Sequence, residues 1–194
     1  MAQLIGFKKI KTAVFISGTG SNLKSLIKFS KLKKSPISIN LIISDNPKAK
    51  GLRLGKIFKI KKKIFEFKEN KVYMEKKILS KLKKDKINLI CLAGFMKILS
   101  KDFIKNFKGI ILNIHPSLLP KFKGLNTHER AIKNKEKFSG CTVHYVNSRL
   151  DSGEIILQKK IRISKTETPK TLHKKILVQE HKLYPKAILK VFNP

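Results

Sequence analysis

Short apolar runs alternate with polar, lysine-rich segments along the first two thirds of the chain. Runs rich in branched apolar residues predict buried strands, whereas the intervening segments place apolar residues three and four positions apart, as helices do. The predicted strands cover residues 12–17, 37–44, 63–67, 88–93 and 110–115, and the predicted helices begin at residue 21 and cover 49–59 and 70–84. Strands that alternate with helices indicate an α/β fold with a mostly parallel central sheet.

The last third of the chain has a different pattern. After a predicted helix at 126–134, two strands at 141–146 and 155–158 are joined by a polar loop, which indicates an antiparallel portion of the sheet. Thr168 and Pro169 then open a long helix, because proline fits the first helical turn. We expect Pro185 to break or kink this helix, since proline lacks the N–H group of an interior helical bond.

The length of 194 residues allows one sizeable core, so we expect a single domain over residues 1–194. No apolar run is long enough to span a bilayer, and the first residues lack the extended apolar core of an export signal. Cys91 and Cys141 lie in apolar segments and are interpreted as buried thiols rather than a disulfide pair. A reducing cytoplasm is therefore the expected compartment.

The net charge of +33, taken alone, favours a polyanionic partner such as a nucleic acid or a membrane surface. Only four of the 45 basic residues are arginines, however, and arginine supplies the bidentate contacts that sequence-specific readers of nucleic acids use. The lysines are also spread over the whole chain. We therefore interpret the charge as a general lysine-rich composition, which can still attract anionic substrates.

The most informative stretch is the predicted strand at 110–115 and the segment that follows it. Side chains alternate across a strand, so Asn113 and His115 should point to the same side at its carboxyl end. Open α/β sheets bind ligands beyond the carboxyl ends of their strands, so this amide and imidazole predict a reaction site. Pro116 and Pro120 restrict the backbone that leaves the strand.

A glycine-containing turn, residues 18–22, connects the first predicted strand to the first predicted helix. Such a turn directs backbone N–H groups and the positive end of the helix dipole at one point, which suits a phosphate. Leu23 stands where a dinucleotide fingerprint requires glycine, and no nucleoside-triphosphate motif follows, so a phosphomonoester is favoured. The alternative is an ordinary helix start capped by Ser21, and this segment alone leaves both open.

Two further segments have both a functional and a structural interpretation. Residues 94–99 are unusually apolar for a surface connection, so they either line a pocket for a flat ligand or belong to the core. Asp151 either forms a turn in its glycine-containing loop or orients His115 and favours its charged form.

An amide, an imidazole and a carboxylate together suit the transfer of an acyl-type group. The amide can support an oxyanion without exchanging protons, and the imidazole can carry protons near neutral pH. No serine or cysteine has an obvious basic partner, so direct attack by the acceptor is favoured over a covalent intermediate. The five histidines show no metal-ligand spacing, and His144 and His173 are interpreted as structural or surface residues.

Five motifs follow one another in the chain: SGTGSNL at 17–23, LAGFMKIL at 92–99, NIHPSLLP at 113–120, LDSG at 150–153 and QEH at 179–181. Together they resemble the phosphoribosylglycinamide formyltransferase family, folate-dependent enzymes of purine biosynthesis, over almost the full length of the chain. The resemblance implies a Rossmann-like domain that transfers a formyl group from the co-substrate 10-formyltetrahydrofolate to the glycine amine of 5'-phosphoribosylglycinamide (GAR). It implies no metal.

The resemblance also assigns roles to individual residues. In catalysis, Asn113 would stabilise the tetrahedral oxyanion, His115 would donate a proton and Asp151 would raise the pKa of His115. The residues that contact GAR would be Gly20, Ser21, Asn22 and Glu180. The residues that bind folate would be Lys71, Met96, Lys97, Ile98, Leu99 and Asn113. No specific nucleic acid and no membrane is expected as a partner, and the chain would act as a monomer or homodimer.

The chain departs from the family at a few positions. The family commonly has arginine where this chain has Lys71 and Lys97, so charge is retained there but bidentate geometry is not. Asn126 stands where the family has histidine. Methionyl-tRNA formyltransferase and formyltetrahydrofolate deformylase share the same polar residues, but both are expected to be longer. A basic RNA-binding module would explain the charge, but not the polar set on an apolar strand.

Overall fold

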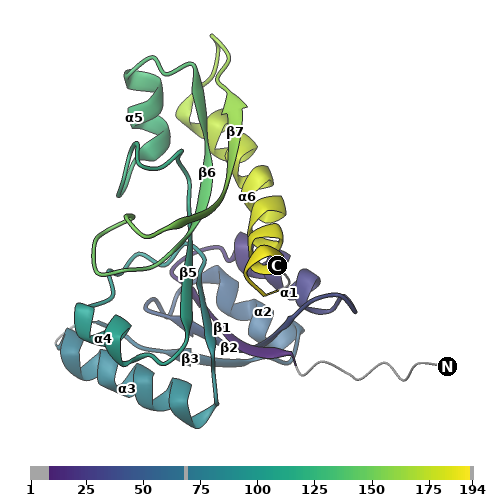
Figure 1. Ribbon diagram of the computed structural model, residues 1–194, viewed down its shortest axis with the longest axis vertical. Coiled ribbons are helices and arrows are strands. Elements are labelled where there is room, and N and C mark those ends of the chain that lie inside the picture. Colours follow the sequence, from purple (N-terminus) through teal and green to yellow (C-terminus); the bar gives the residue numbers. More distant parts are fainter. Residues whose placement is uncertain (1–8, 68–69, 193–194) are drawn as a thin grey trace.

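All strands of the computed structural model, which describes residues 9–67 and 70–192, belong to one sheet (Figure 1). In spatial order they are β3 (Lys61–Ile64), β2 (Ile37–Ser44), β1 (Ile10–Ile16), β4 (Leu89–Leu92), β5 (Ile110–His115), β6 (Phe138–Tyr145) and β7 (Ile155–Arg162). Neighbouring strands are parallel from β3 to β5 and antiparallel from β5 to β7. The predicted α/β class with an antiparallel portion is therefore confirmed.

Strand β1 shows why the sheet needs helices on both faces. Its side chains alternate, so Val14 and Ile16 enter one hydrophobic core, whereas Ala13 and Phe15 enter another. The first core is covered by α1 (Ser21–Ser30) and α6 (Pro169–Phe192), and the second by α3 (Lys71–Lys84) and α4 (Lys101–Asn106) (Figure 1). A strand that is covered on both faces is apolar throughout, which is the pattern read from the sequence.

The remaining helical segments are short. The 3-10 turn η1 (Lys50–Leu52) and helix α2 (Arg53–Ile57) follow β2, and α5 (Thr127–Lys133) precedes β6. These elements lie within the predicted helices at 49–59 and 126–134. Within the described residues, no helix has both the length and the apolar character to cross a membrane.

Some boundaries differ from the sequence predictions. The third strand covers Lys61–Ile64 rather than 63–67, because it is an exposed edge strand whose lysines give no alternating pattern. Helix α4 was not predicted, since its six residues are too few for a helical period. Strands β6 and β7 are both longer than predicted. The second half of β7 was missed because it lies at an exposed edge and carries mostly basic residues.

The expected break at Pro185 does not occur, since α6 continues from Pro169 to Phe192. Proline at position 185 cannot donate to the carbonyl of His181, four residues earlier. The hydroxyl of Ser25 on α1 donates to that carbonyl at 2.8 Å instead. The neighbouring helix thus supplies the hydrogen bond that proline removes.

Both cysteines are free and buried. Burial raises the pKa of each thiol, Cys91 and Cys141, to about 12. The interpretation of these residues as buried thiols rather than a disulfide pair is confirmed.

Candidate active site

A cavity of about 510 Å³ lies beyond the carboxyl ends of β1, β4 and β5. Its walls include residues 18–22, which come after β1, residues 92–99 and 113–116, which include the carboxyl ends of β4 and β5, and residues 124–127 and 146–151. The sheet therefore brings together segments that are far apart in sequence. This is the edge at which parallel α/β sheets bind their ligands.

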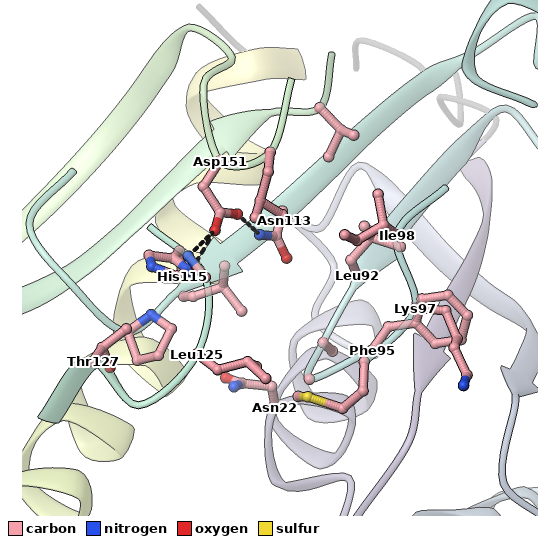
Figure 2. A pocket seen from close by; sticks show the side chains of 18 of the residues that line it. Asn22, Leu92, Phe95, Lys97, Ile98, Asn113, His115, Leu125, Thr127 and Asp151 are labelled. Atoms are coloured by element: carbon pink, nitrogen blue, oxygen red, sulfur yellow. Dashed lines mark hydrogen bonds and ion pairs between the residues drawn. The ribbon is translucent and has the colours of Figure 1, made fainter. Parts of the chain in front are cut away.

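The carboxylate of Asp151 lies between the side chains of Asn113 and His115 (Figure 2). The amide nitrogen of Asn113 donates to Oδ1 of Asp151 at 3.3 Å, and Oδ2 of Asp151 lies 3.4 Å from Nδ1 of His115. Asn113 and His115 share one side of β5 because they are two residues apart. The structure thus brings together the three residues that the motifs assign to catalysis.

His144 is a fourth member of this polar set, and the sequence did not identify it. The side chain of His144 is buried. Its Nε2 atom lies 3.2 Å from the amide nitrogen of Asn113 and 3.7 Å from Oδ1 of Asp151. The position follows from pairing, because Asn113 on β5 is directly opposite His144 on β6. His144 is therefore not a surface residue.

Opposing effects act on the proton affinity of His115. Burial lowers its pKa, whereas the carbonyl of Phe122 and the carboxylate of Asp151 raise it, and His144 and Arg130 lower it further. The net pKa lies below the ordinary value of 6.5. Asp151 does act in the predicted direction, but burial outweighs it. The Nε2 atom of His115 lies 2.8 Å from the Phe122 carbonyl, so this nitrogen carries a hydrogen.

Asp151 is kept ionised by its neighbours. Burial raises its pKa, but His144, the backbone N–H of Gly124 and His115 lower it more, so the net pKa is below the usual value. The N–H of Gly124 donates to Oδ2 at 2.9 Å. Asp151 also has a positive φ of 45° in its loop, so both sequence interpretations, turn former and partner of His115, describe it.

The turn at residues 18–22 leaves the start of α1 free of side-chain caps. The residue before the helix is Gly20, with φ of 74°, and Ser21 is already helical, so the predicted alternative of a Ser21 cap is wrong. Gly20 also approaches another backbone closely, because a Cβ there would lie 2.7 Å from Cα of Gly51. The first N–H groups of α1 thus face the cavity without a capping side chain.

Asn22 and Glu180 form a buried polar pair in the wall of the cavity. The amide nitrogen of Asn22 donates to Oε2 of Glu180 at 2.6 Å, while Oδ1 of Asn22 is buried without a hydrogen-bond partner. Burial raises the pKa of Glu180, and the bond from Asn22 lowers it less. Glu180 lines the cavity and its carboxylate can accept further hydrogen bonds, so it matches a ligand with hydroxyl groups.

Residues 92–99 form the wall across the cavity from Asp151 and His115 (Figure 2). Leu99 is buried in the core beside Phe103, but Met96 and Ile98 are 60% and 61% exposed despite their apolar side chains. Leu99 is thus part of the core, whereas the side chains of Met96 and Ile98 are exposed at the cavity, and the binding of a flat ligand there stays a prediction. Lys97 also lines the cavity.

The structure does not bring Lys71 to the cavity. Lys71 is the first residue of α3, and its Nζ lies 3.9 Å from Oε1 of Glu75. Its assignment to folate binding stays a prediction.

Two other histidines lie close together near the cavity. His173 lines it, and Nδ1 of His173 lies 3.3 Å from Nε2 of His128. Among residues 9–67 and 70–192, no group of three or more histidine, cysteine or acidic side chains could hold a metal ion.

The fold and the site define an α/β protein with a cavity at the carboxyl edge of a mostly parallel sheet, where an amide, an imidazole and a carboxylate lie together. A family model described as formyl transferase matches residues 10–188, and the chain belongs to this family. The family resemblance of the motifs is confirmed.

Particular relatives agree with this membership. The chain is 39% identical over 180 residues to phosphoribosylglycinamide formyltransferase of Bacillus subtilis, with 92% of each chain covered. It is 40% identical over 183 residues to the human trifunctional purine biosynthetic protein adenosine-3, of which it spans only 18% of the length. The crystal structure of phosphoribosylglycinamide formyltransferase from Brucella melitensis has a TM-score of 0.89 and 41% identity, covering 95% of this chain and 96% of that chain.

Proposed function

We propose that this chain transfers the formyl group of 10-formyltetrahydrofolate to the glycine amine of GAR, a step of de novo purine biosynthesis. One observation carries the proposal: a single cavity is bordered by an uncapped helix start, a buried amide–imidazole–carboxylate set and an apolar wall. These features suit a phosphorylated acceptor, acyl-type chemistry and a flat donor. Relatives that match over most of their length carry the name of this activity.

The acceptor would bind between α1 and α6. The N–H groups at Gly20, Ser21 and Asn22 suit its phosphate, since a helix start favours an anion. The ribose hydroxyls would donate to the carboxylate of Glu180, which lines the cavity. A phosphate next to the Glu180 carboxylate would be repelled, so the two parts of the ligand have a defined order along the cavity.

The donor would bind against the 92–99 wall. The pteridine of a folate is flat and largely apolar on its faces, so the exposed side chains of Met96 and Ile98 match it. The ammonium group of Lys97 would contact the carboxylates of the folate. Asn113 would contact the formyl group itself, at the end of β5.

The reaction would proceed by direct attack. The amine nitrogen of GAR forms a bond to the formyl carbon, and the carbonyl oxygen becomes an oxyanion that Asn113 stabilises through its amide N–H. Collapse of this intermediate breaks the bond from the formyl carbon to N10 of the folate. N10 takes a proton from His115, while the proton of the attacking amine is released, so the products are formyl-GAR and tetrahydrofolate.

The amide hydrogens of Asn113 are directed at His144 and Asp151, at 3.2 and 3.3 Å, which are long for hydrogen bonds. The formyl oxygen would therefore replace either His144 or Asp151 as the acceptor of one Asn113 amide hydrogen. Asp151 would keep the imidazolium of His115 oriented until it gives its proton to N10. The predicted compartment is the cytoplasm, and the predicted assembly is a monomer or homodimer.

The proposal is tested by measuring formyl transfer from 10-formyltetrahydrofolate to GAR, beside a control without acceptor and beside His115→Ala. Loss of the formyl donor that requires GAR and disappears in the variant would support the transferase. Loss of the donor without acceptor would indicate a deformylase instead. If the formyl donor is consumed neither with nor without GAR, the proposal is overturned, and methionyl-tRNA is the next acceptor to test.

A further inference from the structure

Glu75 is a buried acidic residue that does not line the cavity. It lies on α3, on the same buried face as Ile78 and Leu82, and it is only 3% exposed. A carboxylate is unfavourable in such a position unless hydrogen bonds satisfy its oxygens. The contacts of Glu75 therefore indicate what it does.

Both oxygens of Glu75 accept hydrogen bonds from one residue, Ser100, and Oε1 also lies 3.9 Å from Nζ of Lys71. Oε1 accepts the backbone N–H of Ser100 at 2.9 Å, and Oε2 accepts the Ser100 hydroxyl. The hydroxyl oxygen in turn accepts the N–H of Phe103 at 3.0 Å and so caps α4. Glu75 thus fixes the residue at which the 92–99 wall ends and α4 begins.

The other end of the wall is fixed as well. The hydroxyl of Ser17, after β1, accepts the N–H of Met96 at 2.8 Å and donates to Asp45. The N–H of Ser17 donates to the carbonyl of Gly94 at 3.0 Å. Between these two polar anchors, Met96 and Ile98 are held out of the core at the cavity.

We propose that Glu75 is a positioning residue for the formyl donor, which it serves through Ser100 by holding the 92–99 wall in the conformation that the folate contacts. This inference rests on the proposed function. Glu75 itself touches neither substrate, and the acceptor side of the cavity is built from α1 and α6, which it does not contact. Loss of Glu75 should therefore weaken donor binding and leave acceptor binding and the chemical step in place.

The test uses Glu75→Gln, which keeps the size of the side chain but has only one acceptor oxygen for the two donors of Ser100. This variant also removes the ion pair with Lys71, whereas Ser100→Ala leaves that pair intact, so the effect of Ser100→Ala decides the role of the Ser100 contact. We expect KM for 10-formyltetrahydrofolate to rise about fivefold, with kcat and KM for GAR changed less than about twofold. Ser100→Ala should have the same effect, and the double variant should be no worse than Ser100→Ala alone. The matched control is Asp85→Asn, which breaks the ion pair with Lys81 at the other end of α3 and should leave all three constants unchanged.

Calorimetric titration with tetrahydrofolate gives a readout that needs no catalysis. Its Kd should rise in Glu75→Gln and in Ser100→Ala but not in Asp85→Asn. An unchanged donor KM and Kd in both variants, or an equal rise in KM for GAR, would overturn the inference. A wild-type protein that binds tetrahydrofolate but transfers no formyl group would overturn the proposed function, while the titration would still decide the role of Glu75.

Discussion

The Nδ1 atom of His115 lies 3.4 Å from Oδ2 of Asp151, and both side chains are less than one tenth exposed, at 7% and 8%. Burial disfavours the imidazolium, and the carboxylate favours it. The surrounding protein thus lowers the pKa of His115, and Asp151 limits how far it falls. The pair therefore sets the pH range in which His115 can donate a proton.

Replacement of Asp151 by asparagine should shift the pH dependence of the reaction. If protonated His115 is the acid, activity falls as pH rises through its pKa, which is already below 6.5. Without the carboxylate the pKa of His115 falls further, so activity begins to decline at a lower pH. Activity at neutral pH then drops about tenfold for each unit by which this pKa falls. The check is kcat/KM as a function of pH for both proteins. An identical midpoint in Asp151→Asn would exclude this role.

Asn113→Ala should reduce kcat by a factor of about 10² to 10³, because an oxyanion would lose its amide donor. KM for GAR should change little, since the acceptor side of the cavity is built from other residues. Steady-state kinetics with each substrate varied in turn measures both constants. A reduction of less than about tenfold would mean that another donor supports the oxyanion.

The fold and the core of the site could be predicted because they depend on local patterns. The apolar runs of β1, β2, β4 and β5 are buried on both faces, so their hydrophobicity is unambiguous. The spacing of Asn113 and His115 is a property of one strand. The position of the glycine turn at the carboxyl end of β1 follows from chain order alone.

The remaining features depend on contacts between distant segments. His144 joins the site only because β6 pairs with β5 in a register that puts it opposite Asn113, and the sequence does not specify that register. The contact of Phe122 with His115 comes from a loop with no periodic pattern. The predicted break at Pro185 does not occur because Ser25 on α1, which is 160 positions away, supplies the missing hydrogen bond.

Gly20→Ala should destabilise the protein by about 2–4 kcal/mol, because the new Cβ meets backbone that cannot move and the residue must adopt a positive φ. The Cβ would lie 2.7 Å from Cα of Gly51, with φ at 74°. KM for GAR should also rise, since the helix start would shift. Urea unfolding and kinetics provide the measurements.

The matched control for stability is Gly18→Ala. Its Cβ would have nothing within 4 Å, and Gly18 does not have a positive φ. Equal destabilisation by the two substitutions would contradict the argument from close approach.

His128 should make the protein less stable in mild acid. Burial, then the charges of His173 and His115, lower its pKa from 6.5 to about 4. As pH falls, His128 is protonated in the unfolded chain before it is protonated in the folded protein. The stability that neutral His128 contributes is therefore fully present above pH 6.5 and is lost as pH falls towards 4. Wild-type protein should lose roughly 2 kcal/mol more than His128→Gln over this range. Urea unfolding at several pH values measures the difference, and parallel curves for the two proteins would refute it.

Lys97→Arg should strengthen donor binding. Lys97 lines the cavity on the wall that borders the proposed folate site, at a position where the family commonly has arginine. An ammonium group contacts a carboxylate as a point charge, whereas a guanidinium group can donate two parallel hydrogen bonds. KM for 10-formyltetrahydrofolate should therefore fall about twofold to threefold in Lys97→Arg and rise in Lys97→Ala.

The matched control for the added guanidinium is Lys101→Arg, on the neighbouring helix α4 and outside the cavity lining. If Lys97→Arg leaves KM unchanged while Lys97→Ala raises it, the carboxylate is held by charge alone, and the lysine-rich composition of this chain has replaced arginine here without loss.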